Sequence, residues 1–209
     1  MAERGTAGRP ADATADTEEA RVRSAAARLF AELGYDATSN RMIADAAGVD
    51  PGTVPDRYGG KQGLYMRVNE LTAERWRNRM ASLRETFTPD GSGLAQFADM
   101  YLDYSLENPE VPKLLTHRWM SDASDVTRLD DEIVGPLLQE TIGLVRSALG
   151  PEVDAEATLW TIVWTVHGYL QAGYLDATGR RSPPSDPGAL RRFRRYQHWL
   201  IQRMTSSSA

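Results

Sequence analysis

The sequence of 209 residues contains no cysteine, which excludes disulfide bonds, thiolate chemistry and cysteine-ligated zinc. Histidine is scarce as well, and His117, His167 and His198 do not have the spacing of paired metal ligands. No apolar run approaches the roughly 18–20 residues that a membrane-spanning helix needs. We therefore expect no metal site, no cofactor and no transmembrane segment.

Motifs that mark common enzyme classes are also missing. The chain has no glycine-rich phosphate loop, no nucleophile elbow and no HExxH pair. Acidic residues are plentiful, but nothing in their spacing marks two of them as a general acid and a general base. We therefore expect no catalytic residues and no enzymatic activity.

Lysine is the rarest charged residue, because Lys61 and Lys113 are the only lysines among 24 basic residues and the rest are arginine. This bias, with abundant alanine and glycine, suggests a bacterial genome rich in G and C. The net charge of −5 means that any binding to nucleic acid must depend on a local site. Residues 1–17 are small and polar, so we expect a flexible tail without a secretory signal, and a soluble cytoplasmic protein.

Helical periodicity dominates the remaining sequence and no β-alternation is evident. Val22, Ala26 and Phe30 lie on one helical face, and Gly34 follows as a stop signal. We predict an all-α fold of about nine helices. The expected helices cover residues 18–33, 41–47, 51–58, 62–87, 94–107, 111–120, 129–149, 155–177 and 189–205. Residues 18–64 would form a small N-terminal domain, and residues 65–209 a larger helical domain.

The three short N-terminal helices have the arrangement of a helix-turn-helix, whose last helix enters the major groove of DNA. Thr38 and Ser39 are suited to cap the second helix, and Gly48 to make the turn after it. Asp50 and Pro51 would begin the third helix. The pattern therefore favours a DNA-binding domain.

Residues 30–39 (FAELGYDATS) and 43–49 (IADAAGV) resemble the DNA-binding domain of the tetracycline-repressor (TetR) family. Residues 52–54 (GTV), Tyr58 and residues 61–64 (KQGL) continue the resemblance in order. It implies a homodimeric transcriptional regulator, usually a repressor, that binds a palindromic operator and is released by a small ligand. The residues that it assigns to DNA contacts are Ser39, Arg41, Thr53, Arg57, Tyr58 and Lys61.

Two positions depart from the family pattern. Pro55 stands where the family usually has tyrosine, and in a helix that begins at Pro51 it would remove an interior hydrogen bond. The third helix is therefore expected to be distorted or to begin later. Asp56 places a carboxylate on the face expected to meet DNA, where it repels phosphate or accepts from a cytosine amine. Residues 18–64 contain six basic and seven acidic residues, a net charge of 6 − 7 = −1, although DNA-binding domains are usually basic.

Stripes of small and apolar residues on the last two long helices favour dimerisation. Two such helices from each subunit would form a four-helix interface, whereas the alternative is that both stripes pack within one chain. The residues that we assign to the dimer interface are Thr161, Thr165, Gly168, Ala172, Phe193, Gln197 and Leu200.

Large aromatic residues with a few polar neighbours predict a mainly apolar ligand pocket, although each of them alone is also suited to filling a core. The residues that we assign to this pocket are Met100, Tyr104, His117, Trp119, Trp160, Trp164 and His167. The sequence thus predicts a ligand-responsive DNA-binding regulator that acts as a homodimer. The alternative is a helical dimer that binds a small molecule or a protein and has lost specific DNA binding.

Overall fold

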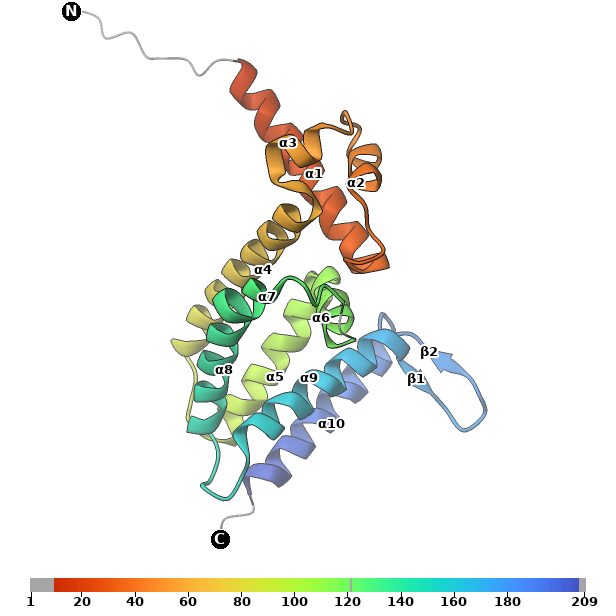
Figure 1. Cartoon of the computed structure of the whole chain (residues 1–209). Coiled ribbons are helices and arrows are strands. Elements are labelled where there is room, and N and C mark those ends of the chain that lie inside the picture. Colours follow the sequence, from red (N-terminus) through yellow and green to blue (C-terminus); the bar gives the residue numbers. More distant parts are fainter. Residues whose placement is uncertain (1–9, 121, 207–209) are drawn as a thin grey trace, which may run out of the picture. The chain divides into compact units, whose positions relative to one another are not determined.

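The computed structural model describes residues 10–120 and 122–206, and almost all of its regular structure is helical (Figure 1). The elements are α1 (Pro10–Leu33), α2 (Asn40–Ala47), α3 (Thr53–Tyr58), α4 (Gly60–Arg84), α5 (Gly91–Glu107), α6 (Glu110–Trp119), α7 (Thr127–Leu129), a π-helical turn (Asp130–Val134), α8 (Gly135–Ser147), α9 (Ala155–Ala172), β1 (Tyr174–Leu175), β2 (Arg181–Ser182) and α10 (Pro187–Thr205). The predicted all-α class is confirmed. Among the described helices, none is long and apolar enough to cross a membrane.

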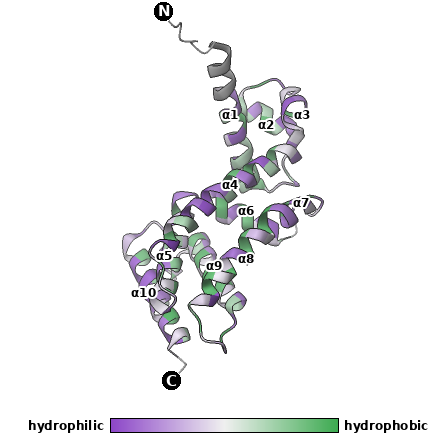
Figure 2. Cartoon of the chain, turned by 90° about the vertical axis from the view of Figure 1, so that its left-hand side faces the viewer, coloured by the Kyte–Doolittle hydropathy of each residue, from purple (hydrophilic) through white to green (hydrophobic). Residues whose placement is uncertain are grey.

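The chain forms two compact units. The first comprises the residues up to Thr72 together with Lys113–Leu129, and the second comprises Ala73–Pro112 together with the residues from Asp130 onward. The helix-turn-helix therefore shares its unit with a segment from much later in the sequence. Figure 2 shows hydrophobic and hydrophilic residues on different faces of the helices, as expected where each helix buries one side.

The core of the first unit is built around an aromatic cluster. Phe30 from α1 and Tyr65 from α4 meet edge to face, with ring centroids 5.1 Å apart, and Tyr35 lies 4.8 Å from Tyr65. All three residues are buried, and Ile43 of α2 and Val54 of α3 are also fully buried. These contacts fix α1 and the two short helices in one rigid arrangement.

The core of the second unit is formed by α5, α8, α9 and α10, joined by the C-terminal part of α4. On α9, Leu159, Val163 and Val166 are buried, as the stripe of large apolar residues predicts. Tyr169 of α9 stacks on Phe193 of α10 at 4.3 Å. Not every face of α9 is buried in the single chain, because Trp164 is 58% exposed.

Several helix boundaries differ from the prediction, among them the starts of α1 and α3 and the end of α9. Helix α1 begins at Pro10 rather than Glu18, since an alanine-rich segment with proline in its first turn favours helix. Residues 1–9 of the predicted tail lie outside the described residues. Helix α3 begins at Thr53, and α9 ends at Ala172, where Gly173 has a φ of 62° and leads into a short antiparallel hairpin of β1 and β2.

Gly135 and Pro136 fall within the segment predicted as one helix over residues 129–149, and the structure divides that segment. A π-helical turn at Asp130–Val134 comes before α8, and Pro136 lies in the first turn of α8, where a missing N–H leaves no helical acceptor unpaired.

Candidate nucleic-acid interface

Helices α2 and α3 form the helix-turn-helix, and the caps follow the sequence signals. The backbone N–H of Met42 donates to the Ser39 side-chain oxygen at 3.2 Å, which confirms Ser39 as the N-cap of α2. Gly48 ends α2 in the left-handed conformation with a φ of 67°. A residue with a side chain would be strained in this conformation, so glycine favours the end of α2 at this position.

The late start of α3 resolves the conflict raised by Pro55. Because the helix begins at Thr53, Pro55 is its third residue and lies in the first turn, where backbone N–H groups have no partner within the helix. The expectation that the helix begins later is confirmed, and the expected cap at Asp50–Pro51 is wrong. As a result of this late start, the recognition helix has only six residues. Pro55 and Asp56 are both exposed.

Of the predicted DNA contacts, Ser39 and Arg41 are exposed at the start of α2. The Arg41 guanidinium lies 3.8 Å from the Asp45 carboxylate one turn later, and both side chains are mostly in solvent. Such a pair contributes little and is easily broken. Because this pair is weak, Arg41 is available to a phosphate. Thr53, the first residue of α3, is half-buried.

Arg57 is engaged with another helix of the same unit. Its guanidinium forms an ion pair and a short hydrogen bond with the carboxylate of Glu18 on α1. The same guanidinium lies 5.7 Å from the centroid of the Tyr58 ring. Tyr58 is half-buried, and its buried hydroxyl has no hydrogen-bond partner among the described residues. Arg57 is thus exposed but paired within its own unit, and Tyr58 is only partly accessible.

Lys61 is bound to the turn between α1 and α2. Its ammonium donates to the carbonyl of Tyr35 at 3.0 Å and lies 3.5 Å from the carbonyl of Asp36. It also lies 4.1 Å from the centroid of the Tyr35 ring, in cation–π geometry. Burial and the nearby carboxylates of Asp125, Asp36 and Asp122 raise the pKa of Tyr35. The lysine is thus part of the unit's structure in addition to being a candidate phosphate ligand.

Sequence reasoning missed three residues of this region. Asn40 accepts from the backbone N–H of Lys61 at 2.6 Å and so occupies one of the N–H groups at the start of α4. Glu18 pairs with Arg57, and Asp122 accepts from the backbone of the α1–α2 turn. All three depend on contacts between residues at least 21 positions apart in sequence, so no local pattern marks them.

The comparisons with known proteins agree with this geometry. Residues 22–68 match the model of the family described as bacterial regulatory proteins, tetR family. A stretch of 126 residues is 32% identical to the HTH-type transcriptional regulatory protein RaaS of Mycobacterium tuberculosis. The match covers 56% of this chain and 57% of that protein, so the chain matches little more than half the length of this relative. Residues 22–68 therefore resemble the N-terminal domain of tetR-family regulators.

Solved structures share the fold of this chain along nearly its whole length. A regulatory protein of the TetR family from Rhodococcus RHA1 has a TM-score of 0.64 at 21% identity, over 90% of this chain and 96% of that one. The fatty acid degradation regulator FadR from Bacillus halodurans has a TM-score of 0.65 at 15% identity, over 96% of both chains. FadR from Bacillus subtilis, in complex with stearoyl-CoA, has a TM-score of 0.65 at 14% identity, over 91% of this chain and all of that one. At these identities the likeness establishes the fold alone, with an N-terminal helix-turn-helix and a helical C-terminal part.

The predicted ligand residues fall in both units. His117 and Trp119 belong to the first unit, and the other five, Met100, Tyr104, Trp160, Trp164 and His167, belong to the second. Within the second unit, Trp160 and Trp164 stack at 5.8 Å, and Met100 and Trp160 are partly buried against the core. Tyr104 is buried and meets Trp76 edge to face at 5.5 Å. Burial raises the pKa of the Tyr104 hydroxyl to about 12.

A buried polar pair lies within this aromatic region. The Tyr101 hydroxyl and His167 Nε2 share a hydrogen bond of 2.6 Å, and their rings stack at 6.0 Å. Burial lowers the pKa of His167 to about 4 and raises that of Tyr101, so both groups are neutral at pH 7. The nearby acids of α5 are also engaged, since Asp99 and Asp103 pair with Arg194 of α10. These two carboxylates thus have a partner within the second unit.

The predicted dimer residues divide into exposed and buried groups. Thr165, Gly168 and Ala172 are exposed along α9, and Thr161 is half-buried. Phe193 and Gln197 of α10 are buried in the second unit's own core, and Leu200 is half-buried. The Gln197 amide has no hydrogen-bond partner among the described residues.

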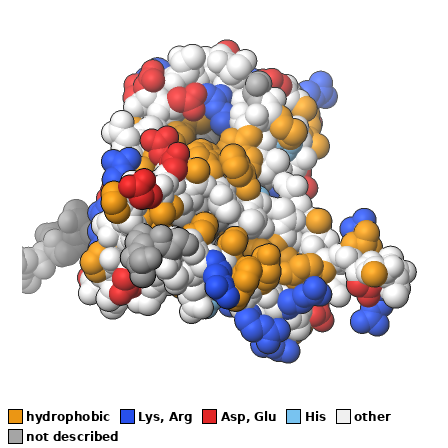
Figure 3. Space-filling view, turned by 90° about the horizontal axis from the view of Figure 1, so that it is seen from below, with side chains coloured by type: hydrophobic (Ala, Val, Ile, Leu, Met, Phe, Trp, Pro, Cys, Tyr) orange, Lys and Arg blue, Asp and Glu red, His pale blue; other side chains and the backbone are white. Residues whose placement is uncertain are grey.

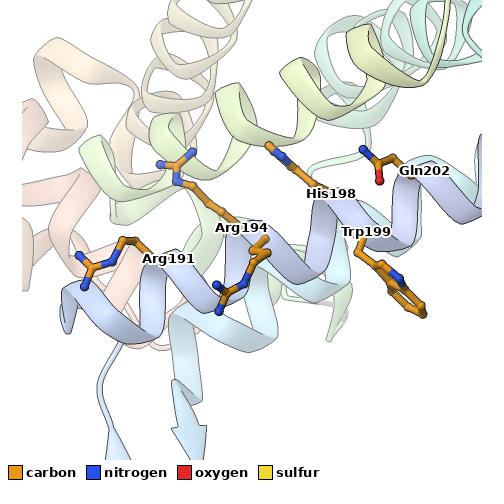
Figure 4. A pocket seen from close by; sticks show the side chains of 6 residues that line it. Arg191, Arg194, His198, Trp199 and Gln202 are labelled. Carbon is orange, nitrogen blue, oxygen red and sulfur yellow. The ribbon is translucent and has the colours of Figure 1, made fainter.

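Aromatic residues are exposed on α9 and α10 beside these positions. Trp164 of α9 and Trp199 of α10 are 58% and 47% exposed, and Tyr196 stacks on Trp199 at 5.4 Å. Figure 3 shows hydrophobic side chains at the surface next to groups of arginines. A groove of about 500 Å³ runs along α10 (Figure 4). It is lined by Arg191, Arg194, Arg195, His198, Trp199 and Gln202.

Proposed function

We propose that this protein is a TetR-family transcriptional regulator that binds double-stranded DNA and responds to a small molecule. The observation that carries the proposal is the capped helix-turn-helix of α2 and α3, in the segment that matches the family model. Arg41 at the start of α2 is exposed and suited to a phosphate, Ser39 before it is exposed as well, and Thr53 at the start of α3 is half-buried. Repression is the mode of action that we expect from the family.

The proposed active form is a homodimer on a palindromic operator. Recognition helices of two subunits enter successive major grooves when they lie about 34–36 Å apart, one turn of DNA. The exposed face of α9 with Trp164 and Gly168, and Trp199 of α10, support a partner surface, because isolated soluble chains seldom expose several large aromatic residues together. Small residues such as Gly168 and Ala172 let a partner helix approach closely.

The proposed effector is mainly apolar or aromatic. The second unit contains the aromatic residues Trp76, Tyr104 and Trp160, with the neutral pair of Tyr101 and His167 among them as a polar group. FadR from Bacillus subtilis, whose fold is similar, has been solved with stearoyl-CoA, a ligand with a long apolar chain. An effector bound here would favour a dimer whose two heads do not fit the operator, and so would shift the population away from DNA.

One set of observations favours the alternative of a helical dimer without specific DNA binding. Two of the three cations predicted to contact DNA, Arg57 and Lys61, are engaged within the chain, and Asp56 is exposed on α3. Replacing Pro55 with tyrosine, the usual family residue, distinguishes the two functions. Affinity for DNA in the wild type supports the regulator, whereas affinity that arises only in Pro55→Tyr supports the alternative.

The experiment that tests the proposal is selection of sheared genomic DNA on the purified protein at low and moderate salt. A palindromic fragment that is retained at moderate salt is the expected result. The Arg41→Ala variant should bind that fragment more weakly and with a smaller salt dependence, because one phosphate contact is lost. Arg67→Ala, which removes the same charge from an exposed position of α4, outside α2 and α3, is the matched control. Recovery of bulk DNA at low salt alone would contradict the proposal.

A further inference from the structure

Asp122, in the loop between α6 and α7, binds the backbone of the turn between α1 and α2. Its two carboxylate oxygens accept from the N–H of Tyr35 at 2.6 Å and from the N–H of Asp36 at 2.8 Å. The residues are separated by more than 80 positions in sequence, but all belong to the first unit. A carboxylate that accepts two backbone N–H groups forms strong, charge-assisted hydrogen bonds.

The loop that carries Asp122 is held in an unusual conformation. Ala123 is fully buried and has a φ of 55°, and it is the only non-glycine residue with positive φ among residues 10–120 and 122–206. The Arg118 guanidinium donates to the carbonyl of Asp122 at 3.1 Å and to that of Ala123. The N–H of Asp122 donates to the carbonyl of His117 at 3.2 Å. Strained backbone of this kind persists only where its surroundings require it, and here it places the carboxylate.

Lys61 binds the opposite groups of the same two residues. The Asp122 carboxylate accepts from the N–H groups of Tyr35 and Asp36. The Lys61 ammonium donates to the Tyr35 carbonyl at 3.0 Å and lies 3.5 Å from the Asp36 carbonyl. Space around the turn is also limited, because a Cβ at Gly34 would lie 3.1 Å from the Asp122 carboxylate. The conformation of the turn and the position of Lys61 therefore depend on Asp122.

We propose that Asp122 is a positioning residue for DNA binding, which makes the affinity of the helix-turn-helix depend on the conformation of residues 113–129. The inference rests on the proposed function, since it concerns how strongly the head binds DNA. When the carboxylate is in place, the α1–α2 turn is fixed, and with it the start of α2 and the side chain of Lys61. When residues 113–129 move, two N–H groups lose their acceptor and the turn loosens.

The test compares Asp122→Asn with Asp125→Asn in the full-length protein. Both variants remove one negative charge from the same loop, but Asp125 is exposed and forms no hydrogen bond to the turn. Asp122→Asn should speed amide exchange at Tyr35 and Asp36 about tenfold and weaken binding to the selected DNA fragment by a similar factor, relative to Asp125→Asn. Asp122→Glu keeps the charge and gives a second variant should the asparagine variant not fold, and it too should bind DNA more weakly than the wild type.

A double-mutant cycle with Lys61→Met separates positioning from a general loss of structure. If Asp122 acts through the turn that Lys61 also binds, the double variant should lose less binding free energy than the two single variants lose together. Equal DNA affinity of Asp122→Asn and Asp125→Asn, or additive losses in the cycle, would overturn the inference and leave the proposed function intact. A wild-type protein that binds no DNA would overturn both, and that result is seen before any variant is made.

Discussion

The carboxylate of Glu18 on α1 is paired with the guanidinium of Arg57 on α3, so that the one arginine of the recognition helix is bound within its own unit. Arg57 is the last-turn basic residue of α3 and one of the residues expected to meet DNA. Because a guanidinium shared with a carboxylate carries less positive potential toward a phosphate, this pair opposes DNA binding.

Replacing Glu18 with glutamine should increase DNA affinity about two- to fivefold, because an exposed pair of this kind contributes about 0.2–1 kcal/mol. The stability of the fold should change little. The measurement is a titration of the selected DNA fragment at fixed salt, with fluorescence anisotropy as the readout. Glu19→Gln is the matched control, since the partner of Glu19 among the described residues is Arg23, one turn along α1 at 3.6 Å. Equal affinities of the two variants would show that any change comes from the loss of one negative charge and not from the release of Arg57.

What the sequence predicts well is local. The cap at Ser39 and the break at Gly48 follow from residue types within a few positions, and the apolar stripe of α9 follows from its period. The contacts of Asp122 with Tyr35 and of Glu18 with Arg57 join residues far apart in sequence, and no periodic pattern records them. For that reason the sequence identified the helix-turn-helix and most of its candidate residues, but not the carboxylates that hold two of its features in place.

The hairpin and the start of α3 illustrate a second limit. β1 and β2 have only two residues each, too short for an alternation to be recognised. At α3, Pro51 has the usual signature of a first helical position, but the tertiary structure begins the helix at Thr53. A local preference of this size is readily overridden by packing.

Gly63 provides a test of the junction between α3 and α4. A Cβ at this position would lie 1.9 Å from the carbonyl oxygen of Tyr58, so Gly63→Ala must displace the backbone. We expect a loss of about 1–3 kcal/mol in the free energy of unfolding, measured by urea denaturation. Gly143→Ala in α8, where no atom lies within 4 Å of the added Cβ, should instead stabilise the protein by about 0.5–1 kcal/mol. A neutral Gly63→Ala variant would contradict the close approach of α4 to α3.

The neutral state of His167 predicts a pH dependence of stability. Burial lowers its pKa in the folded state to about 4, whereas the unfolded chain should titrate near about 6.5. Above pH 6.5 both states are neutral and the residue contributes nothing. Below it the unfolded state takes up a proton that the folded state does not, so stability falls until the pH nears 4, by about 2 kcal/mol between pH 7 and 5.

His167→Gln should lack this part of the pH dependence, because an amide does not titrate. The two proteins are compared by urea unfolding at pH 7 and pH 5 and at one protein concentration, so that all other titrating groups act equally in both. An equal loss of stability in wild type and variant would mean that His167 is protonated in the folded state.

Gly168 tests the proposed dimer surface with the least disturbance of the single chain. No atom lies within 4 Å of a Cβ built at this exposed position, so arginine there should be tolerated by the isolated chain. In a dimer that packs α9 closely against a partner, the same side chain would be forced into the interface and bring an unpaired charge with it. Gly168→Arg should therefore sediment as a monomer at concentrations where the wild type is a dimer. Gly143→Arg, at an equally open position of α8, should leave the dimer unchanged. If both variants are dimers, the interface does not include this part of α9. If the wild type is a monomer, the proposed dimer is contradicted.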